Sequence, residues 1–129
     1  MGVVVARDRE RPDRCGGTGA TAFGEVYTDD TRRELGRAFA DSGATIAGDT
    51  WDRVDEQLQE YSGRWAVTYD GYCRSGVVPT PHRTAVRACL EDRKEQFAYL
   101  VEELGHVDRQ EVAQSVSAAS SLTAPEDCR

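Results

Sequence analysis

Hydrophobic positions recur every three or four residues along residues 50–73, TWDRVDEQLQEYSGRWAVTYDGYC, which is the period of one buried helix face. Asp49 or Thr50 can cap the start of this helix, because either side chain accepts a hydrogen bond from a free backbone N–H group. We therefore predict a long central helix that packs along a single seam. The positions on that seam are Trp51, Val54, Leu58, Tyr61, Trp65, Thr68 or Tyr69, and Tyr72.

A shorter helix is predicted before the central one, over residues 28–43, TDDTRRELGRAFADSG. Asp29 or Asp30 would be its N-cap, and Gly43 is a suitable stop because glycine tolerates the left-handed backbone that often ends a helix. The apolar face expected for this helix consists of Leu35, Ala38 and Phe39.

Two further helices are predicted in the second half of the chain. Thr80 followed by Pro81 indicates a helix start, since proline fits the first helical position, and Gly105 indicates its end. Asp108 and Glu111 have the spacing of a capping box and would open the last helix. The buried positions expected on these two helices are Val86, Leu90, Phe97, Leu100 or Val101, Leu104, Val112, Val116 and Ala119.

These helices predict an all-α fold, a small up-down bundle of about four helices that is braced by disulfides. No strand pattern and no internal repeat is found along the chain. Residues 1–19 are charged and then glycine-rich, and we expect them to form an irregular N-terminal segment. Residues 20–129 are expected to form a single helical bundle domain, in keeping with a chain of 129 residues.

The charge of the chain excludes some classes of partner. The net charge is −7 and the acidic and basic residues are interleaved, whereas nucleic-acid and anionic-membrane binding need a clustered basic surface. We therefore expect no nucleic-acid partner. No apolar run approaches the length of a membrane span or fits a signal peptide, so any membrane attachment would come from an upstream helix absent from this chain.

No set of residues for catalysis, metal binding or cofactor binding is recognised. Residues 16–25, GGTGATAFGE, are glycine-rich but lack the preceding strand and the lysine–serine pair of a phosphate loop. His82 and His106 are isolated at opposite ends of a helix, so they form neither a metal pair nor a nucleophile–base pair. We expect no catalytic residues, no metal and no cofactor, and hence no enzyme.

The four cysteines, Cys15, Cys73, Cys89 and Cys128, are not arranged in CxxC pairs, which argues against a zinc site. Their even number favours two disulfides and an extracytoplasmic location; in the alternative, a cytoplasmic chain, they would be free thiols. We favour the pairing of Cys73 with Cys89, across the connection between two antiparallel helices, although the two positions are offset along the helix axis. Cys15 would then pair with Cys128.

The aromatic residues of the central helix allow two interpretations. Trp51, Tyr61, Trp65, Tyr69 and Tyr72 can be the core of a bundle, because a helix needs such a seam to bury itself. They can also line a ligand pocket, because tyrosine hydroxyls and tryptophan N–H groups need polar partners. The sequence leaves both interpretations open.

Several segments together resemble one region of a known protein family. They are RCGG at residues 14–17, the stretch 26–73, RACLEDR at 87–93 and the stretch 103–128. The markers are two tryptophans on one helix, the cysteine that ends that helix, the Cys89–Leu90 pair and the final Cys128. Residues 14–129 thereby resemble the segment between the transmembrane helix and the tetratricopeptide repeats of large bacterial serine/threonine protein kinases of the myxobacterial type.

The resemblance implies a non-catalytic sensor or regulatory module of a receptor-like kinase, located outside the cytoplasm, that binds an unknown ligand or protein partner. A purely structural spacer that leads into a helical repeat array is the alternative. A small independent enzyme is the third possibility, and it lacks support from any acid–base or nucleophile set. The resemblance transfers no catalytic or ligand-binding residue to this chain.

Overall fold

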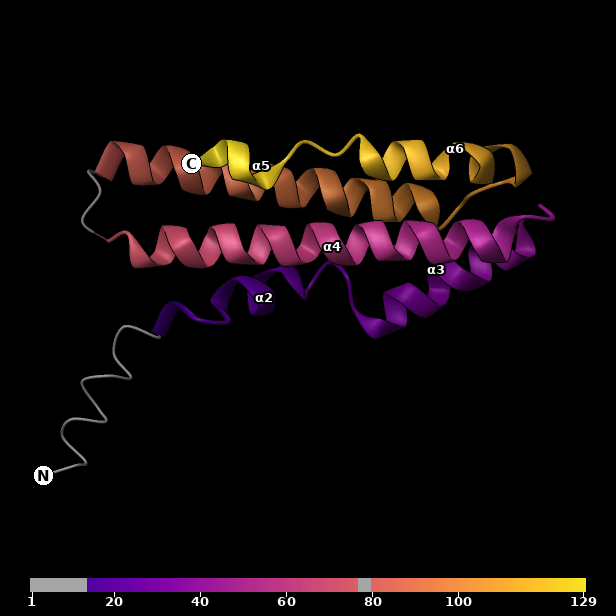
Figure 1. The fold of residues 1–129 in the computed structure, drawn as a ribbon, viewed down its shortest axis with the longest axis horizontal. Coiled ribbons are helices and arrows are strands. Elements are labelled where there is room, and N and C mark those ends of the chain that lie inside the picture. Colours follow the sequence, from indigo (N-terminus) through magenta and orange to yellow (C-terminus); the bar gives the residue numbers. More distant parts are fainter. Residues whose placement is uncertain (1–13, 77–79) are drawn as a thin grey trace, which may run out of the picture.

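The computed structural model describes residues 14–76 and 80–129, and over these residues it contains helices and no strand. The predicted all-α, disulfide-braced up-down bundle is therefore confirmed (Figure 1). The elements are α2 (Thr18–Phe23), α3 (Asp29–Asp41), α4 (Ala47–Arg74), α5 (Thr80–Leu104), α6 (Arg109–Ser120) and the 3-10 helix η2 (Pro125–Cys128).

Helix α4 is the axis on which the other elements pack, and each of them contacts it. With 28 residues it is about 42 Å long. Helices α2 and α3 follow one another along one side of α4 in the opposite direction, so together they form the first arm of the bundle (Figure 1). Helix α5 returns along the other side, and α6 with η2 completes the bundle.

The ends of α3 follow local capping rules, with one correction. The N-cap is Thr28, not Asp29 or Asp30, because the Thr28 hydroxyl accepts a hydrogen bond from the Thr31 N–H at 3.0 Å. The two aspartates lie in the first turn instead, where carboxylates favour the positive end of the helix dipole. Gly43 follows the helix with a φ of 81°, as expected for a glycine that ends it.

Helix α4 starts earlier than the sequence predicted. It begins at Ala47, whereas Asp49 or Thr50 was expected to cap it, and the actual N-cap Ile46 makes no side-chain capping hydrogen bond. Ala47 and Thr50 are both buried, so packing of the first turn decides where this helix starts. The capping box of α6 is confirmed, since Asp108 accepts from the Glu111 N–H at 2.8 Å and Glu111 accepts from the Asp108 N–H at 3.1 Å.

Helix α2 lies partly within residues 1–19, which were expected to be irregular; the structure describes this segment only from residue 14 onward. Asp70 of α4 caps the helix: it accepts hydrogen bonds from the N–H groups of Gly17 and Gly19, at 3.2 and 2.7 Å, and from the Thr18 hydroxyl. Gly19 also allows close approach, because a Cβ atom there would lie 2.7 Å from the Ala66 Cα atom. Helix α2 thus depends on residues about fifty positions away.

The core is built around the aromatic and aliphatic seam of α4. Trp65 is fully buried, and its Nε1–H donates to the Leu90 carbonyl of α5 at 2.9 Å. Phe23 of α2 lies against the same ring at a centroid distance of 4.9 Å. Tyr61 is buried as well, donates its hydroxyl to the Thr123 carbonyl at 2.7 Å, and burial raises its pKa to about 12. The other large buried residues are Leu35, Phe39, Val54, Leu58, Val86, Leu90, Phe97, Leu104 and Val112.

All four cysteines form disulfides, but the predicted pairing is wrong. Cys15 pairs with Cys73 and Cys89 pairs with Cys128, with Cα–Cα distances of 5.6 and 5.5 Å. Cys89 lies nine residues into α5, or about 13 Å along its axis from the start, and is therefore too far from the last turn of α4. The start of the first arm lies beside the end of α4, and η2 returns beside α5, which gives the observed pairs.

We expect Trp65→Ala to lower the free energy of unfolding by about 3 to 5 kcal/mol, the usual range for emptying a large buried aromatic site. The matched control is Tyr99→Ala on α5, where 68% of the side chain is exposed and the change should stay within about 0.5 kcal/mol. Urea denaturation followed by circular dichroism measures both values. Equal losses in the two variants would contradict the buried position of Trp65.

Removal of either disulfide by a double Cys→Ser substitution should cost on the order of 4 kcal/mol, because the bridges close loops of 58 and 39 residues. Peptide mapping of the unreduced protein should recover Cys15 linked to Cys73 and Cys89 linked to Cys128. Recovery of a Cys73–Cys89 peptide would overturn the connectivity. Four free thiols in the unreduced, denatured protein would show that neither disulfide forms.

Candidate functional site

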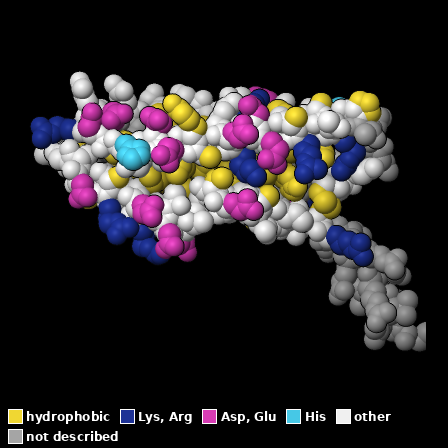
Figure 2. All heavy atoms as spheres, turned by 180° about the vertical axis from the view of Figure 1, so that it is seen from behind, with side chains coloured by type: hydrophobic (Ala, Val, Ile, Leu, Met, Phe, Trp, Pro, Cys, Tyr) yellow, Lys and Arg dark blue, Asp and Glu magenta, His cyan; other side chains and the backbone are white. Residues whose placement is uncertain are grey.

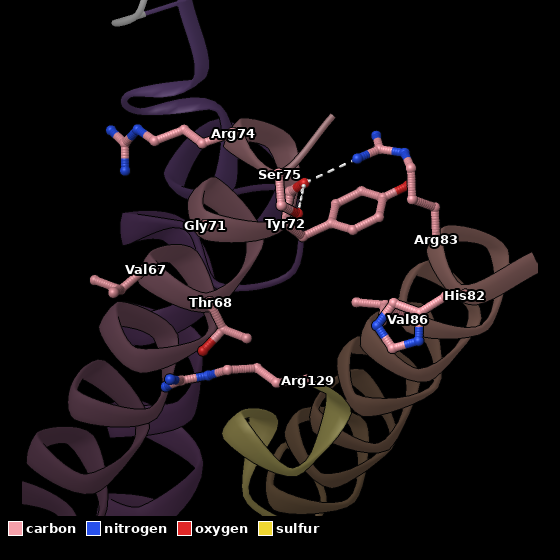
Figure 3. Close-up of a pocket in the computed structure, with 10 residues that line it drawn as sticks. All are labelled: Val67, Thr68, Gly71, Tyr72, Arg74, Ser75, His82, Arg83, Val86 and Arg129. Carbon is pink, nitrogen blue, oxygen red and sulfur yellow. Dashed lines mark hydrogen bonds between the residues drawn. The ribbon is translucent and has the colours of Figure 1, made fainter. Parts of the chain in front are cut away.

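A partly enclosed pocket, referred to as the main pocket, lies between the last turns of α4 and the first turns of α5. Its volume is about 460 Å³, which is within the range of small-molecule sites. The C-terminal residue Arg129 closes one side of it. The lining residues are Val67, Thr68, Gly71, Tyr72, Arg74, Ser75, His82, Arg83, Val86 and Arg129 (Figure 3).

Arg83 and Tyr72 form the best-defined contact of this pocket. The Arg83 guanidinium carbon lies 4.5 Å from the centre of the Tyr72 ring, and one of its N–H groups donates to the Tyr72 carbonyl at 3.2 Å. A ring face attracts a guanidinium, so the stacked tyrosine limits the positions that the arginine can adopt. Figure 3 shows the two side chains meeting across the gap between α4 and α5.

The side chains that line the pocket differ in direction. Thr68 and Tyr72 of α4 and Val86 of α5 point into the space between the two helices, whereas Val67 and Arg74 point away from it (Figure 3). Thr68 and Val86 are buried, and the Thr68 hydroxyl donates to the Arg64 carbonyl of its own helix at 2.9 Å. The inner wall is therefore apolar in character, and the rim is basic.

The two disulfides border this pocket. Cys73 lies between the lining residues Tyr72 and Arg74, and it is bonded to the segment that precedes α2. Cys128 directly precedes Arg129 and is bonded to α5. The pocket walls therefore come from segments that are covalently linked to other parts of the bundle.

The position of η2, and with it one side of the pocket, is fixed by α4. The Arg64 guanidinium donates two hydrogen bonds to the Glu126 carboxylate, at 2.8 and 2.7 Å. The same hydrogen bonds lower the pKa of Glu126 and raise that of Arg64. A paired carboxylate and guanidinium of this kind give a defined geometry, so the chain end is held beside α4 and α5.

A second, shallower pocket of about 290 Å³ lies between α3 and α4 and includes Trp51 and Gly36. Its charged groups are already paired, since Asp55 accepts two hydrogen bonds from Arg32, at 2.9 and 2.7 Å, and one from the Tyr27 hydroxyl at 2.6 Å. Burial and the Asp55 carboxylate raise the pKa of Tyr27. Because these groups satisfy one another, this pocket offers little to a ligand.

The predicted aromatic residues divide among different environments. Tyr61 and Trp65 are in the core, and Tyr69 stacks on Trp65 at 5.1 Å. Trp51 is half-buried and packs against Phe39 of α3 at 5.2 Å. Tyr72 alone among the five lines the main pocket.

The sequence did not single out the basic residues of the pocket. The sequence placed His82 at a helix end and gave it no partner; it is exposed there, and it also lines the pocket. The sequence pattern did not indicate Arg83, although this residue lies in the first turn of α5, across a short connection from the Tyr72 ring at the end of α4. The sequence feature that could have indicated this contact is an aromatic residue at the end of one helix and an arginine at the start of the next.

The described residues contain neither a metal site nor a membrane helix. In that part of the chain no three His, Cys, Asp or Glu side chains come together to hold a metal ion. None of its helices has the length and apolar character that a membrane span requires. Two disulfides are typical of proteins in an oxidising, extracellular-type compartment.

Comparisons with protein-family models, with curated proteins and with solved structures give no match for this chain. The resemblance to a segment of bacterial receptor-like kinases therefore stays a prediction. The functional argument has to start from the pocket and from the disulfides that border it.

Asp55→Asn should lower the free energy of unfolding by about 1.5 to 3 kcal/mol at pH 7, the usual contribution of hydrogen bonds to a charged group. Burial would raise the pKa of Asp55, but the hydrogen bonds from Arg32 and Tyr27 outweigh it and hold that pKa below its usual value. The carboxylate therefore stabilises the fold fully above about pH 4, and this contribution is lost as the pH falls further.

The gap in unfolding free energy between wild type and Asp55→Asn should accordingly narrow when urea denaturation is repeated at pH 3. Asp52→Asn, at an exposed position one turn earlier on α4, is the control and should change stability by no more than about 0.5 kcal/mol. A gap for Asp55→Asn that stays constant between pH 7 and pH 3 would show that the ionised carboxylate has no such role.

Proposed function

We propose that this chain is a non-catalytic sensor module of a bacterial receptor-like serine/threonine protein kinase, and that it binds a small ligand in the pocket between α4 and α5. The observation that carries the proposal is the pocket itself. It combines an apolar inner wall with basic side chains at the rim, which is the usual composition of a small-molecule site. The kinase context rests on the resemblance of residues 14–129.

Two features support a location outside the cytoplasm. The first is the pair of disulfides, since such bonds persist in oxidising compartments and are rare in a reducing cytosol. The second is the resemblance, which implies a segment that follows a transmembrane helix. In this proposal the membrane is reached only through an upstream helix that is absent from this chain, and the kinase domain lies on the opposite side.

A structural spacer is the second candidate, and the length of α4 favours it. A helix of about 42 Å that contacts every other element is a suitable rod between two parts of a longer protein. In that case the pocket would hold no ligand. The two functions differ in one measurable property, the response of stability to small molecules.

A thermal-shift screen of chemically diverse small molecules tests the proposal. A ligand that binds only the folded state raises the free energy of unfolding by about 2.7 kcal/mol at roughly 100 times its Kd, so the melting temperature should rise by several degrees. We expect such a ligand to be found. No shift with any compound would favour the spacer.

Gly71→Trp provides the matched test of the binding position. Gly71 lines the pocket, a Cβ atom there meets nothing within 4 Å, and glycine is a poor helix former, so the variant should fold. Its indole should obstruct the pocket and abolish the rise in melting temperature that the ligand causes. Gly63→Trp, two turns earlier on α4 with the same free space and outside the pocket, should keep it. Equal shifts in both variants would place the ligand elsewhere.

A further inference from the structure

Among the described residues, no Asp or Glu side chain lines the main pocket, in a chain whose net charge is −7. Its basic residues are His82, Arg83 and Arg129, with Arg74 at the edge and pointing away from the cavity (Figure 3). On the face shown in Figure 2, Lys and Arg side chains form a row toward this end of the molecule, on the right of the view. Asp and Glu side chains lie mainly around the middle and the other end, where further Lys and Arg side chains accompany them. The pocket is thus a locally cationic site on an acidic protein, which indicates an anionic ligand.

Arg83 has the geometry of a preorganised anion-binding group. The guanidinium has five N–H donors, and one of them is used by the Tyr72 carbonyl. Among the described residues it forms no ion pair with a carboxylate. The Tyr72 ring covers one face of the group, so the remaining donors lie along its edges, where a carboxylate binds in a bidentate manner.

The inner wall of the pocket is apolar, so it favours a ligand that also has an apolar part. Val86 is 8% exposed and Thr68 is 6% exposed, and the Thr68 hydroxyl is already satisfied by its own helix. The Tyr72 ring adds a further apolar surface on the side of α4. These groups offer contact area and few hydrogen bonds, which suits a hydrocarbon or an aromatic ring and does not suit a small inorganic anion.

The groups inside the pocket, and not the charge of the whole chain, limit the charge of the ligand. At physiological ionic strength the Debye length is about 8 Å, so the basic rim dominates within the pocket while the acidic surface repels anions on approach. The attraction by the rim and the repulsion by the rest of the surface both grow with the charge of the ligand, so the number of charges is set by the groups inside the pocket. Arg83 offers one free guanidinium edge, which matches one carboxylate, and the apolar wall matches an apolar body.

We propose that the pocket between α4 and α5 binds a small monocarboxylate, with the carboxylate on the free edge of Arg83 and the apolar body between Tyr72, Thr68 and Val86. This assignment rests on the proposed sensor function and specifies its ligand class. Arg83 is the group that recognises the charge, and the apolar wall selects against anions without an apolar body.

The test compares carboxylates with their neutral amides, which have nearly the same shape. The probes are benzoate and benzamide, phenylacetate and phenylacetamide, and hexanoate and hexanamide, with inorganic phosphate as the anion that lacks an apolar body. Titration followed by NMR chemical shifts gives the Kd of each probe. In at least one pair the carboxylate should bind at least tenfold more tightly than the amide, a difference of about 1.4 kcal/mol, and phosphate should not bind.

Arg83→Gln removes the charge and should abolish the preference for the carboxylate, while Arg83→Lys keeps the charge without the bidentate fork and should retain part of it. Arg87→Gln is the matched control, because Arg87 is exposed one turn further along α5 and does not line the pocket. It should bind like wild type. Circular dichroism melting curves identify any variant that fails to fold.

The inference is overturned if the amides bind as tightly as the carboxylates, if Arg83→Gln folds and keeps the preference, or if no carboxylate binds. The proposed sensor function has a separate outcome. A neutral or cationic compound that stabilises wild type and not Gly71→Trp would leave that function standing without the carboxylate. If no compound stabilises the wild-type protein, both the carboxylate site and the sensor function are contradicted.

Discussion

The hydrogen bond from the Trp65 indole to the Leu90 carbonyl fixes how α5 lies on α4. The indole N–H is fully buried, so a missing partner would cost the desolvation of a polar group, and the Leu90 carbonyl satisfies it at 2.9 Å. The two helices are antiparallel, so positions seven residues away, toward the pocket, should again face one another. These positions are Tyr72 and Arg83, whose contact shapes the pocket. The register of the core thereby determines the geometry of the candidate site.

Helix periods and caps could be predicted because they depend on near neighbours in the chain. The periodic seam of α4 and the capping box at Asp108 are properties of a few consecutive residues, and the structure agrees with them. Helix α2 could not be predicted in this way. Its short sequence is rich in glycine, and the groups that hold it, the Asp70 carboxylate and the Ala66 backbone, lie about fifty residues away. The sequence of residues 16–25 contains no local pattern that would predict contacts with Asp70 or Ala66.

The disulfide pairing and the pocket depend on the same missing information, the register between segments distant in sequence. Cys73 and Cys89 are close in sequence, and so appeared suited to pair, but the rise of α5 carries Cys89 away from the end of α4. The seam of α4 could be read as core or as ligand site because a sequence period shows which face is buried and not what covers each turn. Tertiary contacts bury Trp65 and leave Tyr72 at the pocket.

The positions of the disulfides give the proposed sensor a physical route from ligand to chain. Cys73 and Cys128 are adjacent to residues that line the pocket, and each is bonded to another segment. The first described residues and the last ones lie toward the same end of the bundle as the pocket (Figure 1). A ligand that moved Tyr72 or Arg129 would therefore shift covalently linked segments together, since a bridge does not lengthen to absorb the displacement. In a receptor of the proposed kind, this end of the bundle is where a binding event would be converted into a change in the chain on either side.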